Sequence, residues 1–229
     1  MPDFCYTDLT IHSSREDLSS IQEYCLSDSK DDDGLPVKAF DFERILPHPK
    51  KICNVSFHSQ MADELRYFCL KSGTPWPSKA EGNQFLRSKN LATSQGGRGL
   101  PFTDYETDFR FCFGDDAFQE GKRLYQNLQQ FGVAGILDWR SKHWNTKWNA
   151  CESTNGFRHL PNGDISISFA TAWNPPTPIF EKLSRKFPDA LFEIFCKYED
   201  MADDDFWTYQ NGVMTKHTQQ LSSFLPEKD

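Results

Sequence analysis

The feature that most constrains the fold is a strand-helix-strand pattern in the last third of the chain. Residues 165–169 alternate between large apolar and polar side chains, as in a strand with one buried face. Thr177-Pro178 is typical of a helix start, with Thr as the N-cap and Pro in the first turn. Residues 192–198 alternate again. This pattern predicts a helix that packs on a sheet, because the helix and both strands each have one apolar face to bury.

The N-terminal part repeats the same order of elements. Tyr6–Ile11 alternates like a half-buried strand, and Ser13-x-x-Glu16 is a capping box that predicts a helix. Asp28–Gly34 is expected to be a solvated loop, and Phe40–Glu43 is expected to be a second strand. Asn162-Gly163 and Asn211-Gly212 predict tight turns in the C-terminal part.

The middle of the chain has helical periodicity. Helices are expected over residues 59–71, 79–91 and 116–130. The complete order is β-α-β, a helical insertion, then β-β-α-β-β, which predicts an α+β fold with a ferredoxin-like antiparallel sheet and helices packed on one face. The expected organisation is a discontinuous domain over 1–53 and 133–215, an insertion over 54–132, and a polar tail over 216–229.

Charge and cysteine spacing exclude several classes of site. The net charge of −8 gives no reason to expect general affinity for a polyanion. The seven cysteines form no C-x-x-C pair, and the six histidines form no H-x-x-x-H pair, so we expect no metal site and no cofactor. No signature of a nucleophile or a P-loop is present, so we expect no enzyme. No apolar run is long enough to span a bilayer, and we expect a cytoplasmic protein with reduced thiols.

Four segments lie in a characteristic order: Phe4–Ile11, Phe40–Pro47, Trp144–Ala150 and Phe169–Pro176. Together they resemble the conserved blocks of the YubB-type, or Api-like, ferredoxin-like family. Asp3-Phe4 replaces the Asn-Trp of its opening block, and Asp8 stands where the family tends to have Asn. The resemblance implies a ferredoxin-like fold without an iron–sulfur cluster, encoded on plasmids and phages of bacteria. It implies no biochemical activity.

Two Trp-Asn segments carry the resemblance most specifically, and they have two interpretations. Aromatic side chains interleaved with cations suit single-stranded nucleic acid, because bases stack on rings and phosphates attract charge. The candidate cations are Arg98, Arg140, Lys142 and Lys147. The alternative, which we favour, is a structural motif that joins helices to the sheet through aromatic packing and asparagine amides. Its residues are Trp144, Asn145, Lys147, Trp148, Trp173, Asn174, Pro175 and Pro176.

An acidic run near the C-terminus is the other candidate surface. Its spacing lacks the central Gly and terminal Glu of an EF-hand, so a loop facing solvent or a partner protein is expected rather than a calcium site. The residues of this acidic surface are Glu199, Asp200, Asp203, Asp204 and Asp205, with Asp31, Asp32 and Asp33 as a second patch.

These features give three hypotheses. The first is a non-enzymatic protein of a mobile element that binds a host or element-encoded protein, with inhibition of a host defence system such as CRISPR interference as one role. The second is an accessory protein for single-stranded nucleic acid. The third is an enzyme with an unrecognised site assembled from distant residues. The sequence specifies neither the partner nor the oligomeric state.

Overall fold

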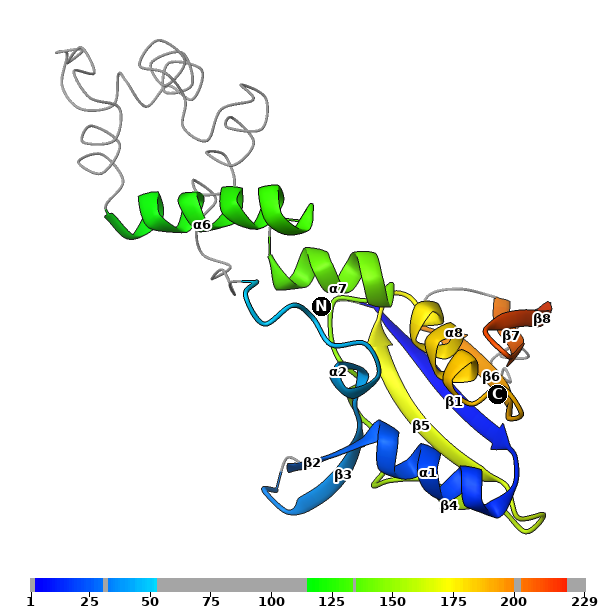
Figure 1. Ribbon diagram of the computed structural model, residues 1–229. Coiled ribbons are helices and arrows are strands. Elements are labelled where there is room, and N and C mark those ends of the chain that lie inside the picture. The colour runs from blue at the N-terminus through cyan, green and yellow to red at the C-terminus, as the bar shows by residue number, and fades with distance from the viewer. Residues whose placement is uncertain (1–2, 31–32, 53–114, 134, 200–202, 222–229) are drawn as a thin grey trace, which may run out of the picture. The chain divides into compact units, whose positions relative to one another are not determined.

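The computed structural model describes residues 3–30, 33–52, 115–133, 135–199 and 203–221 (Figure 1). The chain divides into two compact units. The first contains Met1–His48 and Trp139–Asp229, and the second contains Pro49–Asp138. The second unit is therefore inserted in the sequence of the first, and each is described by itself.

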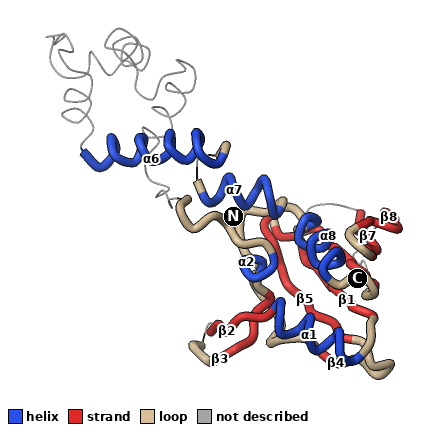
Figure 2. The backbone as a smooth tube through the Cα atoms, viewed as in Figure 1, coloured by secondary structure: helices blue, strands red, loops and turns tan. Residues whose placement is uncertain are grey.

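The first unit is built on a six-stranded antiparallel sheet with the order β4-β5-β1-β6-β7-β8. The sheet contains two strand-helix-strand units that interleave. Strand β1 therefore lies between β5 and β6, as in the ferredoxin-like arrangement. Helices α1 and α8 lie on the same face of the sheet (Figures 1 and 2). The elements are β1 (Phe4–His12), α1 (Arg15–Cys25), β4 (Arg158–His159), β5 (Ile165–Ala172), α8 (Thr177–Lys186), β6 (Leu191–Tyr198), β7 (Asp203–Gln210) and β8 (Val213–Leu221). The predicted fold class is confirmed.

The core lies between this sheet and its helices. Alternate residues of the three central strands are fully or nearly fully buried, as the period of two in the sequence requires: Cys5, Leu9, Ile11, Ile165, Ile167, Phe169, Phe192, Ile194 and Cys196. An aromatic cluster extends this core. The rings of Phe40 and Phe169 stack at 5.0 Å, and Phe42 contacts both Phe169 and Trp144 edge-on at 5.8 and 5.6 Å.

The segment after α1 differs from the sequence expectation. Strands β2 (Leu26–Lys30) and β3 (Pro36–Phe40) form a separate hairpin, so residues 28–30 of the expected loop 28–34 lie in a strand. The expected strand Phe40–Glu43 is also wrong, because helix α2 (Phe42–Ile45) begins there. The carboxylate of Asp41 accepts a hydrogen bond from the Glu43 amide at 2.9 Å and caps this helix, so the chain turns while both flanking Phe rings stay buried.

The C-terminal hairpin follows the predicted turn. Asn211 and Gly212 have positive φ angles of 50° and 74°, which is the conformation a two-residue hairpin turn requires. Strand β8 continues to Leu221, however, and its residues from Lys216 onward pair with β7. Residues 216–221 are therefore part of the sheet and not of a polar tail.

In the second unit, helix α6 (Asp115–Phe131) confirms the helix expected near residues 116–130. The helices expected over residues 59–71 and 79–91 lie outside the described residues. Helix α7 (Ile136–Trp144) belongs to the first unit from Trp139 onward. It ends at Trp144, so Trp148 is not part of the helical face on which Trp144 lies.

We expect Phe42→Ala to lower the free energy of unfolding by about 3–5 kcal/mol, because the ring is fully buried among three other aromatic rings and its removal leaves a cavity. Urea denaturation at constant temperature measures the loss. Val213→Ala, at a site that is 60% exposed, is the control and should change stability by less than about 0.5 kcal/mol. A loss below about 1 kcal/mol for Phe42→Ala would contradict the packing described here.

Candidate functional site

The first Trp-Asn segment fixes the end of α7 to the N-terminal part of the first unit. Trp144 is fully buried, and its indole N–H donates a hydrogen bond to the carbonyl oxygen of Leu46 at 2.9 Å. The guanidinium of Arg140 lies 4.8 Å from the centre of the Trp144 ring. The amide side chain of Asn149 binds both the Phe42 amide and the Asp41 carboxylate at 2.8 Å. These polar atoms tie backbone together and are not available to a ligand.

The two Trp-Asn segments also bind each other. The side-chain amide of Asn145 donates to the carbonyl oxygen of Pro175 at 3.0 Å, and the hydroxyl of Thr146 donates to that of Ala172 at 3.1 Å. Asn145 and Trp173 both have positive φ angles, 67° and 62°, a conformation that non-glycine residues adopt at a cost. Pro176 is the N-cap residue of α8, so the helix begins one residue earlier than its predicted N-cap implied. The contacts of Asn145 and Thr146 are of the kind that the structural interpretation expects between these two segments.

Part of the joint remains exposed. Trp148 is 37% exposed and Trp173 is 39% exposed. The ammonium group of Lys147 lies 4.3 Å from the centre of the Trp173 ring, which places a cation over the ring face that a nucleobase would otherwise stack on.

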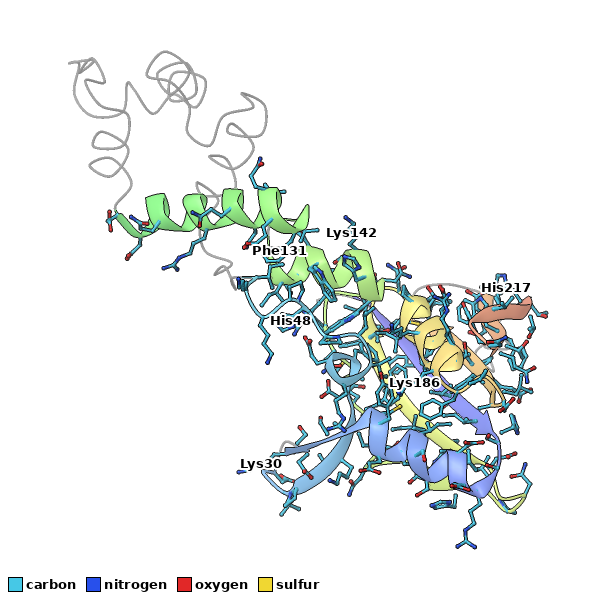
Figure 3. All side chains as sticks on the ribbon, in the orientation of Figure 1. Lys30, His48, Phe131, Lys142, Lys186 and His217 are labelled. Carbon is cyan, nitrogen blue, oxygen red and sulfur yellow. The ribbon has the colours of Figure 1, made fainter. Side chains whose placement is uncertain are left out.

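Two of the predicted nucleic-acid cations that lie in the described residues, Arg140 and Lys147, are engaged within the chain. Arg140 is bound to the Glu43 carboxylate at 2.8 Å, while Lys142 is exposed on α7 (Figure 3). Lys147 is engaged with Trp173, and Arg98 lies outside the described residues. The charge pattern in the sequence gave no sign that a carboxylate from residue 43 pairs with this block.

Three residues of the acidic run, Asp203–Asp205, lie in strand β7 and not in a loop. Asp205 accepts a hydrogen bond from the Tyr198 hydroxyl at 2.7 Å, and its other oxygen is 2.8 Å from the ring nitrogen Nε2 of His217 on β8 (Figure 3). Glu199 accepts from the backbone amide of Phe4 at 2.9 Å, and the backbone of Asp203 pairs with Leu221. The Asp204 oxygen Oδ1 is buried.

This run is therefore built into the sheet, and the expectation of a solvated acidic loop is wrong for residues 203–205. Asp33 is exposed, whereas Asp31, Asp32 and Asp200 lie outside the described residues. Among the residues that the structure describes, no three His, Cys, Asp or Glu side chains are grouped to hold a metal ion.

A different acidic surface lies on the face of the sheet opposite α1 and α8, which we call the open face. Its side chains come from the strand positions that alternate with the buried ones. It combines carboxylates with aromatic rings, and its members are Tyr6, Asp8, Thr10, Ser168, Glu193, Phe195, Lys197 and Phe206. Asp8 is flanked by Ser168 on one neighbouring strand and by Phe195 on the other, and Phe195 pairs in turn with Phe206.

Tyr6 is the most informative residue of the open face. It is 42% exposed, and its ring lies 6.0 Å from that of Phe4. Partial desolvation raises the pKa of Tyr6, and the nearby carboxylates of Glu152 and Glu199 raise it further. The carboxylates near Tyr6 favour cationic groups over phosphates at this end of the open face.

Sequence reasoning missed the open face because only the buried positions of each strand were considered. Phe195 is the residue from which the open face could have been predicted. It occupies an outward position of a strand whose inward positions are already apolar, where an ordinary solvent-facing strand has a polar residue.

Together, the topology and core define the first unit as an α+β ferredoxin-like domain. Residues 143–219, from the end of α7 into β8, match the model of a family described as a ferredoxin-like domain in Api92-like protein. The match confirms the resemblance to an Api-like ferredoxin-like family. No curated protein matches this chain. Among solved structures, a protein api92 from Yersinia pseudotuberculosis is similar over 96% of this chain and 98% of its own, with 12% identity and a TM-score of 0.46.

The described helices include none that is long and apolar enough to cross a membrane.

The carboxyl group of Glu43 leads to a prediction of how the stability of the fold depends on pH. Burial favours its neutral form, but hydrogen bonds from Arg140 and His48, at 2.8 and 2.7 Å, outweigh burial and lower the pKa of Glu43. A lowered folded-state pKa stabilises the fold above the unfolded-state pKa, and this contribution is lost as the pH falls through the folded-state value.

Glu43→Gln should therefore lower the free energy of unfolding by about 1–3 kcal/mol at neutral pH, and the difference from the unmodified chain should shrink as Glu43 becomes protonated. Urea denaturation over a pH series measures both effects. Glu181→Gln, in an exposed pair with Arg185 on α8, should have little effect at any pH. An equal loss for Glu43→Gln at acidic and neutral pH would show that the charge is irrelevant.

Proposed function

We propose that this chain is a non-enzymatic binding protein whose open face binds a basic surface of another protein. The observation that carries the proposal is the juxtaposition of two exposed side chains, Tyr6 and Asp8, with half-buried ones on the same sheet face. The half-buried members are Glu193, Phe195 and Phe206. Aromatic rings supply contact area at low entropic cost, and carboxylates select partners that carry Lys or Arg.

The net charge of the chain supports a basic partner. At −8, the chain attracts cationic surfaces and repels nucleic-acid phosphates over the Debye length. The surroundings of Tyr6 have the same sign of charge, because the carboxylates of Glu152 and Glu199 lie close enough to raise its pKa. Lys197 is a cationic member of the open face, and the ring nitrogen Nε2 of His12 lies 3.0 Å from its member Glu193.

The resemblance to proteins of plasmids and phages supplies the setting of the proposal, a bacterial cytoplasm with a host or element-encoded partner. Proteins that handle nucleic acid in host defence, such as those of CRISPR interference, expose basic grooves for phosphates. An acidic and aromatic sheet face is complementary to such a groove and would block it without any catalytic step.

The test is a pull-down from bacterial lysate followed by titration of the purified partner. Tyr6→Ala and the pair Asp8→Asn/Glu193→Gln should each weaken binding by at least about tenfold, and binding should weaken as salt increases. Glu16→Gln/Glu181→Gln removes the same charge from exposed positions of α1 and α8 and should leave affinity unchanged.

Equal affinity of the open-face and helix-face variants would reject the open face as the binding surface. Titration with single-stranded DNA at two salt concentrations tests the accessory-protein alternative. Salt-dependent DNA binding that Lys142→Ala weakens would favour that alternative, because phosphate contacts release counterions.

A further inference from the structure

A polar cleft of about 670 Å³ lies between α1 and the β4–β5 connection. One wall comes from the segment Ser13–Gln22, and the other comes from His159 and the turn Asn162–Asp164. Its volume is within the range of about 300–1,000 Å³ that small-molecule sites occupy. The cleft is separate in sequence and in its lining residues from both the joint and the open face.

Hydrogen-bond donors face this cleft without a partner in the described part of the chain. Arg15 and Ser19 belong to α1, and His159 belongs to β4 on the opposite wall. Gln22 adds an amide from the next turn of α1. Arg15 and His159 are the two lining residues able to carry positive charge, and they come from opposite walls of the cleft.

The carboxylate of Asp164, the acidic lining residue, is held by hydrogen bonds to its neighbours. Asp164 lies 2.6 Å from the ring nitrogen Nδ1 of His12, and the side chain of Asn162 donates a hydrogen bond to the same carboxylate. The other ring nitrogen of His12 is 3.0 Å from Glu193. Burial lowers the pKa of His12, but its hydrogen bonds to the two carboxylates outweigh this and raise it. Asp17 accepts hydrogen bonds from Ser13 and Ser14.

We propose that this cleft binds a small phosphate-bearing molecule, with Arg15 and His159 holding the phosphate. Oxygen acceptors with negative charge match the unpaired donors, and a guanidinium binds phosphate through two parallel hydrogen bonds. The cleft is larger than a phosphate group, and its remaining polar lining, Ser19 and Gln22, suits a hydroxyl-bearing body such as a sugar. Leu18 supplies the apolar part of the wall.

Nitrogen-15 NMR titration of the full chain tests the proposal. The probes are ribose 5-phosphate, adenosine 5′-monophosphate and inorganic phosphate. Ribose and adenosine are the unphosphorylated controls for the first two. The phosphorylated probes should shift the amides of Arg15 and Gly163, and ribose and adenosine should bind at least about tenfold more weakly. If ribose 5-phosphate or adenosine 5′-monophosphate binds more strongly than inorganic phosphate, the ribose or adenosine part of that probe also contacts the cleft.

The variant Arg15→Ala/His159→Ala should weaken binding of the phosphorylated probes at least about tenfold. Both side chains are exposed, so the variant should fold, which its amide spectrum checks directly. Arg185→Ala, on α8 and outside the cleft, is the matched control and should bind as the unmodified chain does. Absence of amide shifts with every probe at millimolar concentration, or equal affinity of the double variant, would overturn the proposal.

Discussion

The pairing of β1 with strands far along the chain is the interaction on which the rest of the structure depends. Phe4–Ile11 pairs with β5 on one side, and Cys5–His12 pairs with β6 on the other. The hydrogen bonds of β1 therefore close loops of more than a hundred residues. Such closure costs entropy that grows only slowly with loop length, so a large insertion between the partners is tolerated. The buried Cys5, Leu9 and Ile11 offset this cost by packing against the strands on both sides.

Much of this fold was predictable because it rests on period-two alternation and on turn chemistry. The alternation in β1, β5 and β6 predicted the three central strands, and Asn211-Gly212 predicted the C-terminal hairpin. The β2–β3 hairpin was not predictable in the same way. It is a two-stranded sheet whose strand β2, Leu-Ser-Asp-Ser-Lys, has no apolar alternation, so the tertiary hydrogen bond from Gly156 to Lys38 is part of what holds it.

The candidate surfaces were harder to predict, because their character depends on pairs that are distant in sequence. In the sequence, Arg140 looks like a nucleic-acid contact, but in the structure it is bound to Glu43. Asp205 likewise looks like a solvated acid but is bound to Tyr198 and His217. The open face has the reverse property. No single member of the open face marks a binding surface in the sequence. Only the pairing register of β1 with β6 brings Tyr6, Asp8 and Phe195 together.

The adjacency of His48 and Trp139 has a consequence for how this chain can vary. These residues end the two segments of the first unit, and their rings lie 6.4 Å apart. The inserted unit thus departs from and returns to nearly one point, as a domain does when it enters a host fold through a surface loop. Because the strands of the first unit pair among residues outside Pro49–Asp138, a change in the length of that segment leaves the register of every strand pair in the six-stranded sheet unaltered.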